Sequence, residues 1–198
     1  MNSVLIASQN LGKLKEFQSL LSPQFSCVPA DHRAPEVDEN GTTYRENAYK
    51  KAKAYVEIYQ IPVLSDDSGL EIDALNGAPG LWSARFGGEG ISWKERFQKL
   101  YEQLAPYPAD QWTARFRCIL CYLIPRGEPL YFEGVCEGRI DRNPKGTGGF
   151  GYDPIFYSSQ LAKSLGEAPS AEKALVSHRA QAVQAFLDWA KKNPHKLS

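Results

Sequence analysis

The chain has 198 residues, of which 42% are hydrophobic and 23% are charged, a composition typical of a folded globular protein. Its 23 basic residues balance its 23 acidic residues, so no broad basic face for nucleic acid is expected and any phosphate site must be local. No apolar run approaches the roughly 20 residues that cross a bilayer, and the first ten residues lack a secretory signal pattern. These features predict a cytoplasmic protein with neither membrane nor nucleic-acid partners.

The first half of the chain alternates apolar runs with amphipathic segments. Its predicted elements are a buried strand at 4–7, a helix from about 12 to the Ser22-Pro23 pair, a helix at 45–60, and a short strand at 61–64 that leads into Ser65-Asp66-Asp67-Ser68-Gly69. Strands that alternate with helices in this way are typical of a mixed α/β fold.

The second half begins with a glycine-rich segment at 76–90, which predicts a long loop. Ser92 and Glu95 form a capping box that opens a helix. The expected buried stripe of that helix is Trp93, Phe97, Leu100, Tyr101 and Leu104. Further along, an antiparallel hairpin is predicted from strands at 112–124 and 129–137, then a glycine-rich loop at 145–153 and a helix at about 171–192. Residues 1–198 are therefore expected to form one domain with a long curved mixed sheet and two lobes around a central cleft.

Asn10 and Lys13 lie where the first predicted strand passes into a helix. Exposed N–H groups and the helix dipole favour an anion at such a point. The positive charge of Lys13 in the first helical turn is unfavourable to the dipole, unless a bound phosphate compensates for it. An ordinary solvated turn has the same appearance, and the P-loop pattern is absent.

Asp66 and Asp67 follow an apolar strand, where alternation directs them to opposite faces. Magnesium prefers oxygen ligands, usually one or two carboxylates together with substrate phosphates, so Asp67 is the candidate ligand and Glu39 a second carboxylate. A solvated Asp-Ser-Gly turn is the alternative. Lys51 lies on the predicted helix at 45–60, one helical turn past Glu46 or Asn47, and a charged helix of this kind usually presents a solvated face.

Residues 146–151 satisfy G-x-G-x-x-G, but Tyr152-Asp153-Pro154 follows instead of a helix start, so a dinucleotide-binding interpretation fails. A loop that brings Phe150 and Asp153 against a base fits better. Lys173 and Arg179 offer only donors, which suits the 6-keto edge of a purine and not the amino group of adenine.

Two further patterns predict no chemistry. Cys118 and Cys121 are three apart in a predicted strand and so face opposite sides, which argues against a zinc or redox pair and for reduced, buried thiols. Ser177 and His178 are adjacent on a predicted helix and do not face each other, which argues against a catalytic triad.

Taken together, five segments closely resemble the inosine triphosphate pyrophosphatase (Ham1-like) family. They are SQNLGKLKE (8–16), ENGTTYRENAYKKA (39–52), SDDSGLEIDALNGAPGLWSARF (65–86), GTGGFGYDPIF (146–156) and EKALVSHR (172–179). The resemblance implies an α/β fold with helices on both sides of the sheet, a homodimer, and Mg²⁺-dependent hydrolysis of ITP, dITP and XTP between the α- and β-phosphates.

The resemblance also implies roles for individual residues. Triphosphate contacts are expected from Ser8, Gln9, Asn10, Lys13 and Lys51; metal contacts from Glu39 and Asp67, with Asp67 also the general base; substrate contact from Ser68; a nucleoside pocket from Phe150, Gly151, Tyr152 and Asp153; and base reading by Lys173, His178 and Arg179.

The sequence departs from the family pattern at two positions. Gln9 replaces a usual glycine and lacks its freedom at positive φ, and Asn40 replaces a usual threonine, which leaves open whether Asp38 or Glu39 is the metal carboxylate. Two other classes also stay open: a pyrophosphatase for modified pyrimidine nucleotides, and a nucleotide sensor without catalysis.

Overall fold

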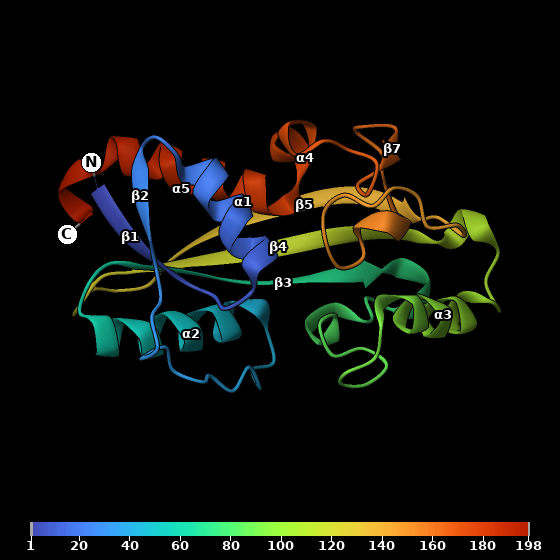
Figure 1. Cartoon of the computed structure of the whole chain (residues 1–198), viewed down its shortest axis with the longest axis horizontal. Helices are drawn as coiled ribbons and strands as arrows, with labels where there is room; N and C mark the ends of the chain where they lie inside the picture. Colours follow the sequence, from blue (N-terminus) through green and yellow to red (C-terminus); the bar gives the residue numbers. More distant parts are fainter. Residues whose placement is uncertain (1, 198) are drawn as a thin grey trace. The chain divides into compact units, whose positions relative to one another are not determined.

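The computed structural model describes residues 2–197, which divide into two compact units. Among the described residues, unit 1 comprises 2–67, 118–134 and 179–197, and unit 2 comprises 68–117 and 135–178. A seven-stranded sheet has the order β2-β1-β3-β4-β5-β6-β7, and all of its strands except β6 are labelled in Figure 1. Its strands are β1 (Asn2–Ala7), β2 (Phe25–Pro29), β3 (Val63–Ile72), β4 (Thr113–Leu123), β5 (Leu130–Ile140), β6 (Phe156–Ser158) and β7 (Lys163–Ser164). The five α-helices among the described residues are α1 (Leu11–Leu21), α2 (Tyr44–Tyr59), α3 (Trp93–Leu104), α4 (Ser170–Val176) and α5 (His178–Lys192).

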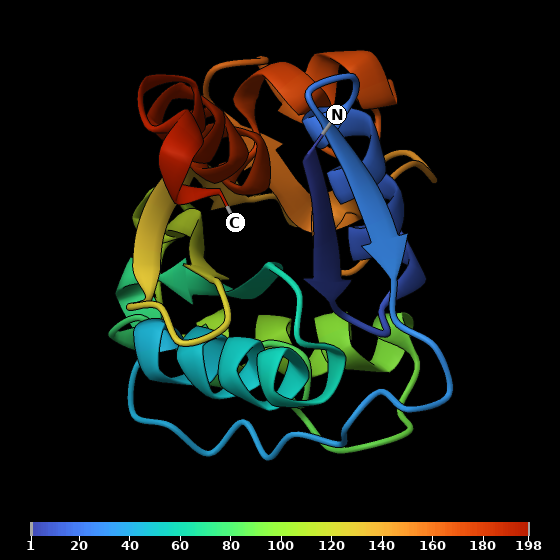
Figure 2. The same ribbon diagram turned by 90° about the vertical axis from the view of Figure 1, so that its left-hand side faces the viewer.

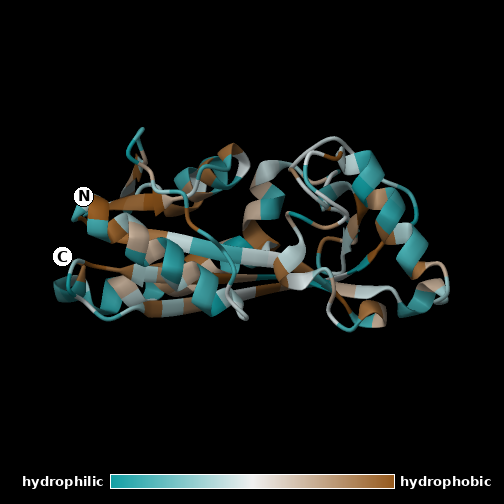
Figure 3. Cartoon of the chain, turned by 90° about the horizontal axis from the view of Figure 1, so that it is seen from below, coloured by the Kyte–Doolittle hydropathy of each residue, from teal (hydrophilic) through white to brown (hydrophobic). Residues whose placement is uncertain are grey.

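Unit 1 is built on β1, which pairs in parallel with both β2 and β3. Helices α1 and α5 lie over one face of these strands and α2 lies over the other (Figures 1 and 2). β1 is hydrophobic along most of its length (Figure 3). Its alternating side chains therefore supply both layers: Val4 and Ile6 pack with α1 and α5, whereas Leu5 and Ala7 pack with α2.

In unit 2, β5 pairs antiparallel with β6, and β6 with β7. Helix α3 begins with the predicted capping box, in which Ser92 and Glu95 bond to each other's backbone N–H groups. Its buried residues Phe97, Leu100 and Leu104 pack in one core with the unit 2 parts of β3 to β6. The sheet thus has parallel and antiparallel neighbours, and the predicted mixed α/β fold is confirmed.

Four expectations about elements were wrong. β3 does not end before Ser65 but continues to Ile72, because Asp66 and Asp67 both have buried polar partners. The predicted helix at 171–192 is two helices, since Ser177 is extended, with ψ 151°. Trp93 is 43% exposed although it was placed in the buried stripe. Finally, β5 extends three residues beyond the predicted strand end.

The two cysteines of the C-x-x-C pattern lie on opposite faces of β4, as predicted. Cys118 belongs to the core beside α1 and α5, and Cys121 belongs to the core beside α2. Burial raises the pKa of each thiol to about 12. Both side chains are therefore structural. Within residues 2–197 there is also no helix with the length and apolar content that a membrane crossing needs.

Candidate active site

The segment between β1 and α1 is a capped helix start. The Asn10 side chain accepts hydrogen bonds from the backbone N–H groups of Gly12 and Lys13, at 2.9 and 3.1 Å. Ser8 Oγ in turn accepts from the Asn10 N–H at 3.2 Å. Gln9, near the Tyr55 hydroxyl, is not among the described residues with positive φ, so this turn forms without the family's glycine. The turn presents backbone donors and Lys13 at one helix N-terminus.

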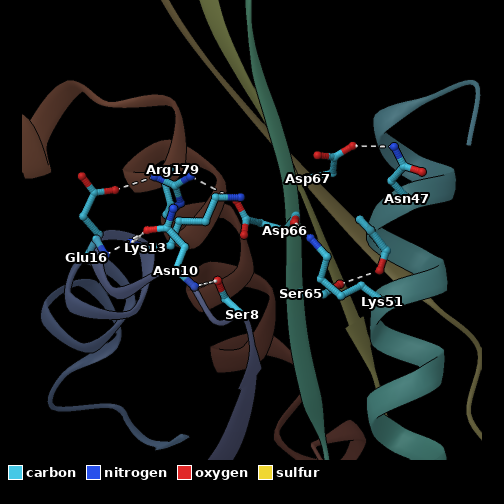
Figure 4. A network of polar contacts seen from close by, with 12 residues as sticks. Ser8, Asn10, Lys13, Glu16, Asn47, Lys51, Ser65, Asp66, Asp67 and Arg179 are labelled. Atoms are coloured by element: carbon cyan, nitrogen blue, oxygen red, sulfur yellow. Dashed lines mark hydrogen bonds and ion pairs between the residues drawn. The ribbon is translucent and has the colours of Figure 1, made fainter. Parts of the chain in front are cut away.

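Asp66 gathers cations from two helices on one face of β3 (Figure 4). Its Oδ2 lies 2.9 Å from Lys13 Nζ and 3.0 Å from Arg179 Nη2. Arg179 also pairs with Glu16, one turn along α1 from Lys13. Burial alone would raise the pKa of the Asp66 carboxyl, but Lys13, Arg179 and Lys51 together hold that pKa well below its usual range. Asp66 is therefore a charged, fully buried residue that holds Lys13 and Arg179 in position.

Asp67 faces the opposite side of β3, toward α2 (Figure 4). Its Oδ2 accepts a hydrogen bond from Asn47 Nδ2 at 3.0 Å. Burial raises the pKa of Asp67, and the Asn47 bond and the nearby Lys51 oppose that shift. Lys51 Nζ lies 2.8 Å from Glu39 Oε1 and donates to the Asp66 carbonyl oxygen at 2.9 Å. The predicted Lys51, Glu39 and Asp67 thus lie together in unit 1.

Three cations face four carboxylates in this unit 1 cluster: Lys13, Lys51 and Arg179 against Glu16, Glu39, Asp66 and Asp67. The carboxylates outnumber the cations, so a further cation would favour the binding of a polyanion. Glu39 and Asp67 fit this need, because two carboxylates that sense each other's charge suit a hard divalent ion. No group of three or more His, Cys, Asp or Glu side chains arranged for a metal occurs between residues 2 and 197.

Unit 2 contains a second buried cluster around Asp153. Asp153 Oδ2 lies 2.7 Å from Lys173 Nζ and accepts from the Phe150 N–H at 2.8 Å. Lys173 Nζ also lies 4.8 Å from the centre of the Phe150 ring. A Cβ on Gly149, whose φ is +70°, would come within 2.0 Å of the Asp153 carboxylate, so only glycine admits this approach. The Lys173–Asp153 ion pair therefore lies directly against the glycine-rich loop.

The remaining predicted residues of unit 2 are Gly151, Tyr152, His178 and Ser68, and the first three of them lie beside aromatic rings. Tyr152 donates to the Ser83 carbonyl oxygen at 2.9 Å and meets Trp93 edge to face, with ring centres 5.1 Å apart. Gly151, with φ +67°, would bring a Cβ to 3.6 Å from the Trp93 ring. The His178 ring stacks on Phe116 with centres 4.8 Å apart. Ser68, the first residue of this unit, lies on β3 and is partly exposed.

Arg179 lies in unit 1 although it was grouped with Lys173 and His178 as a base-reading residue. It is only 1% exposed, and its guanidinium is held between Glu16 and Asp66. The extended Ser177 that separates α4 from α5 was not predicted from the sequence. Base reading by Arg179 stays a prediction, whereas its ion pairs are part of the unit 1 cluster.

The sequence did not predict the contacts of three polar residues of unit 1. These are Glu16, Asn47 and Asp66, the last of which is a buried partner of Arg179. Each resembled an ordinary polar residue of a solvated helix face or turn. The only available signal was the Asp66-Asp67 pair itself, because two adjacent buried carboxylates on opposite faces require partners on both.

Residues 4–189 match the Ham1 family, and the chain belongs to that family of proteins. It is 43% identical over 192 residues to the dITP/XTP pyrophosphatase of Halalkalibacterium halodurans, covering 96% of this chain and 99% of that protein. It is 42% identical to the dITP/XTP pyrophosphatase of Escherichia coli strain K12, with 95% and 98% coverage.

Solved structures give the same assignment. A HAM1 protein from Coxiella burnetii matches with a TM-score of 0.88 and 38% identity, over 97% of this chain and all of that chain. The Ham1 protein of Staphylococcus aureus matches with a TM-score of 0.85 and 34% identity, over 96% and 99% of the two chains. The predicted family and its fold are thereby confirmed.

Proposed function

We propose that this protein hydrolyses deaminated purine nucleoside triphosphates, namely ITP, dITP and XTP, to the monophosphate and pyrophosphate. The observation that carries the proposal is the unit 1 cluster, in which the buried Asp67 lies beside Lys51 and Glu39. Relatives that align over nearly the whole chain at more than 40% identity are named dITP/XTP pyrophosphatases, which supports the same activity.

In this proposal the triphosphate binds to unit 1. Ser8, Gln9 and Asn10 hold the turn whose backbone donors face an anion at the start of α1. Lys13 and Lys51 offer positive charge to phosphate oxygens, while Asp66 keeps both lysines in position through its carboxylate and its carbonyl oxygen. A triphosphate thus meets cations that are already fixed in place, which reduces the reorganisation needed for catalysis.

Asp67 is proposed as the general base. Its burial raises its pKa, which makes the carboxylate a better proton acceptor than an exposed aspartate. Asp67 accepts a proton from water, and the water oxygen bonds to the α-phosphorus. The bond from that phosphorus to the oxygen bridging the α- and β-phosphates breaks, so that pyrophosphate leaves. Glu39 and Asp67 together would hold a divalent cation, proposed to be Mg²⁺. When bound, such an ion neutralises charge on the phosphate oxygens as it develops.

The base is proposed to bind to unit 2. Phe150 offers a ring for stacking, and Gly151 and Tyr152 shape the loop beside it. Lys173 and Asp153 form a paired donor and acceptor, with His178 and Ser68 as further polar groups of the same unit. A 6-keto purine with a ring N–H satisfies a donor and an acceptor, whereas the adenine amino group would leave the donor unpaired.

The homodimer is proposed from the family resemblance, and the cytoplasmic location stays a prediction from the sequence. Trp82 and Trp93, which are 61% and 43% exposed, are large hydrophobic side chains available to an interface. Light scattering after size exclusion tests the dimer: a mass near twice the 22.1 kDa of one chain supports it, and a mass of one chain contradicts it.

The reaction is tested by identifying its products. Phosphorus NMR of ITP incubated with the protein and Mg²⁺ should give inosine monophosphate and pyrophosphate in equal amounts, and omission of Mg²⁺ should stop the reaction. Release of inosine diphosphate and orthophosphate would contradict cleavage between the α- and β-phosphates. Binding of ITP without any product would indicate a nucleotide sensor instead.

A further inference from the structure

Asn47 connects two parts of unit 1 that the proposed reaction requires. It lies in the first turn of α2 and is 1% exposed. Its Nδ2 donates to Asp67 Oδ2 at 3.0 Å, and its Oδ1 accepts from the Gly41 N–H at 2.7 Å. Gly41 follows Glu39 by two residues. A single side chain therefore links the segment that carries one proposed metal ligand to the other ligand itself.

The chemistry of an amide suits this position. Asparagine has an acceptor oxygen and a donor NH₂ on the same carbon, whereas a carboxylate only accepts and an aliphatic side chain does neither. Because the Gly41 N–H can only donate and the Asp67 carboxylate can only accept, the orientation of the Asn47 amide is determined. In that orientation the amide NH₂ holds the Oδ2 atom of Asp67.

The contact with Gly41 is close enough to exclude a side chain at residue 41. A Cβ there would lie 2.6 Å from Asn47 Oδ1 and 2.9 Å from Glu46 Cβ. Glu46 Oε2 also accepts from the Thr42 N–H at 2.7 Å, so the same turn of α2 binds the next residue of the loop. The Glu39 segment is thus held directly against Asn47, and the Glu39 to Lys51 ion pair is a second attachment to α2.

We propose that Asn47 is a positioning residue that sets the separation of Glu39 and Asp67 required by a divalent cation. The inference rests on the proposed function of these two carboxylates as metal ligands. Side chains that orient metal ligands typically contribute ten- to hundredfold to metal affinity. Loss of the Asn47 amide should therefore weaken Mg²⁺ binding without affecting the residues of unit 2 that are proposed to bind the base.

Three variants test this proposal. Asn47→Ala removes both hydrogen bonds, and Gly41→Ala displaces the loop while the Asn47 side chain stays in place. Asn40→Ala is the matched control, because Asn40 lies in the same loop but bonds to Asp38 and Lys50. For each folded protein, calorimetry gives the Mg²⁺ dissociation constant, once with the protein alone and once with saturating α,β-methylene-ITP. The KM for ITP is measured at saturating Mg²⁺.

The dissociation constant for Mg²⁺ should rise ten- to hundredfold in Asn47→Ala and in Gly41→Ala, and stay within twofold in Asn40→Ala. The KM for ITP should stay within threefold in all three. A Mg²⁺ dissociation constant for Asn47→Ala within twofold of that of the unmodified protein would overturn the proposal. If Asn47→Ala does not fold, a dissociation constant for Gly41→Ala within the same twofold limit would overturn it. Failure of the proposed function would be visible separately, as absence of ITP turnover by the unmodified protein.

Discussion

Replacement of Asp66 by asparagine is expected to destabilise unit 1 strongly. The change removes the negative charge that two cations share, Lys13 at 2.9 Å and the fully buried Arg179 at 3.0 Å. Removal of one partner from a buried ion pair typically costs about 3–5 kcal/mol. Here Glu16 still neutralises part of the Arg179 charge, and an asparagine oxygen still accepts one hydrogen bond, so we expect about 2–4 kcal/mol.

For a chain of this length, each kcal/mol shifts the unfolding midpoint by about 2–4 °C, so Asp66→Asn should lower it by roughly 4–16 °C. Calorimetry measures this shift directly. Asp31→Asn is a matched control, because the pKa of Asp31 is also strongly lowered by its hydrogen bonds with Arg33, but the pair is exposed and solvent screens it. An equal loss in both variants would refute the argument that burial makes Asp66 important.

The pH dependence of stability provides a second check on the same residue. The pKa of Asp66 is lower in the folded protein than in the unfolded chain, where it is about 3.9. The stabilisation from the ionised carboxylate is therefore fully present above about pH 4 and is lost as the pH falls toward the folded pKa. The difference in unfolding free energy between the unmodified protein and Asp66→Asn should accordingly be constant from pH 5 to 8 and shrink below pH 4.

Three further predictions concern activity and thiol chemistry. Asp67→Asn should reduce kcat for ITP by at least about 100-fold while circular dichroism and the unfolding midpoint show a folded protein, because the proposed general base is lost; near-normal turnover would remove Asp67 from that role. Lys173→Met should raise the KM for ITP by about 10- to 100-fold, since it breaks a buried charge-assisted contact with Asp153, and an unchanged KM would exclude Lys173 from base binding. Cys118 and Cys121 should not react with Ellman's reagent at pH 8 until the protein is unfolded, and rapid labelling of the native protein would contradict their burial.

The main elements of the fold were predictable because their signals are local. β1 is an apolar run, α2 has its hydrophobic residues at helical spacing, and the Ser92 capping box marks the start of α3. β2, β6 and β7 were missed: β2 forms through pairing with the distant β1, whereas β6 and β7 are too short to show a periodic pattern. The same limit explains β3, because Asp66 and Asp67 look like a turn until their partners from other elements are known.

The candidate site was predictable in its residues but not in its connections. Asp67, Lys51 and Glu39 were identified individually, and their proximity in unit 1 required the tertiary structure. The burial of Arg179 between Glu16 and Asp66 depends on the extended Ser177, which no periodicity in the sequence marks. The role of Asn47 could not be predicted for a related reason. On a charged helix, the surrounding sequence is the same whether an asparagine is buried or exposed to solvent.

The central claim is that the protein removes deaminated purine nucleoside triphosphates by a Mg²⁺-dependent reaction. It is tested most directly by kcat/KM for pyrophosphate release from ITP, dITP, XTP, ATP and GTP, each with and without Mg²⁺. We expect turnover of the first three to exceed that of ATP by at least about 100-fold, because the adenine amino group leaves a buried donor unpaired, and to require Mg²⁺. Guanine shares the 6-keto group and the ring N–H, so rejection of GTP must come from its 2-amino group. Equal turnover of ATP and ITP, or turnover that persists without any divalent cation, would contradict the account.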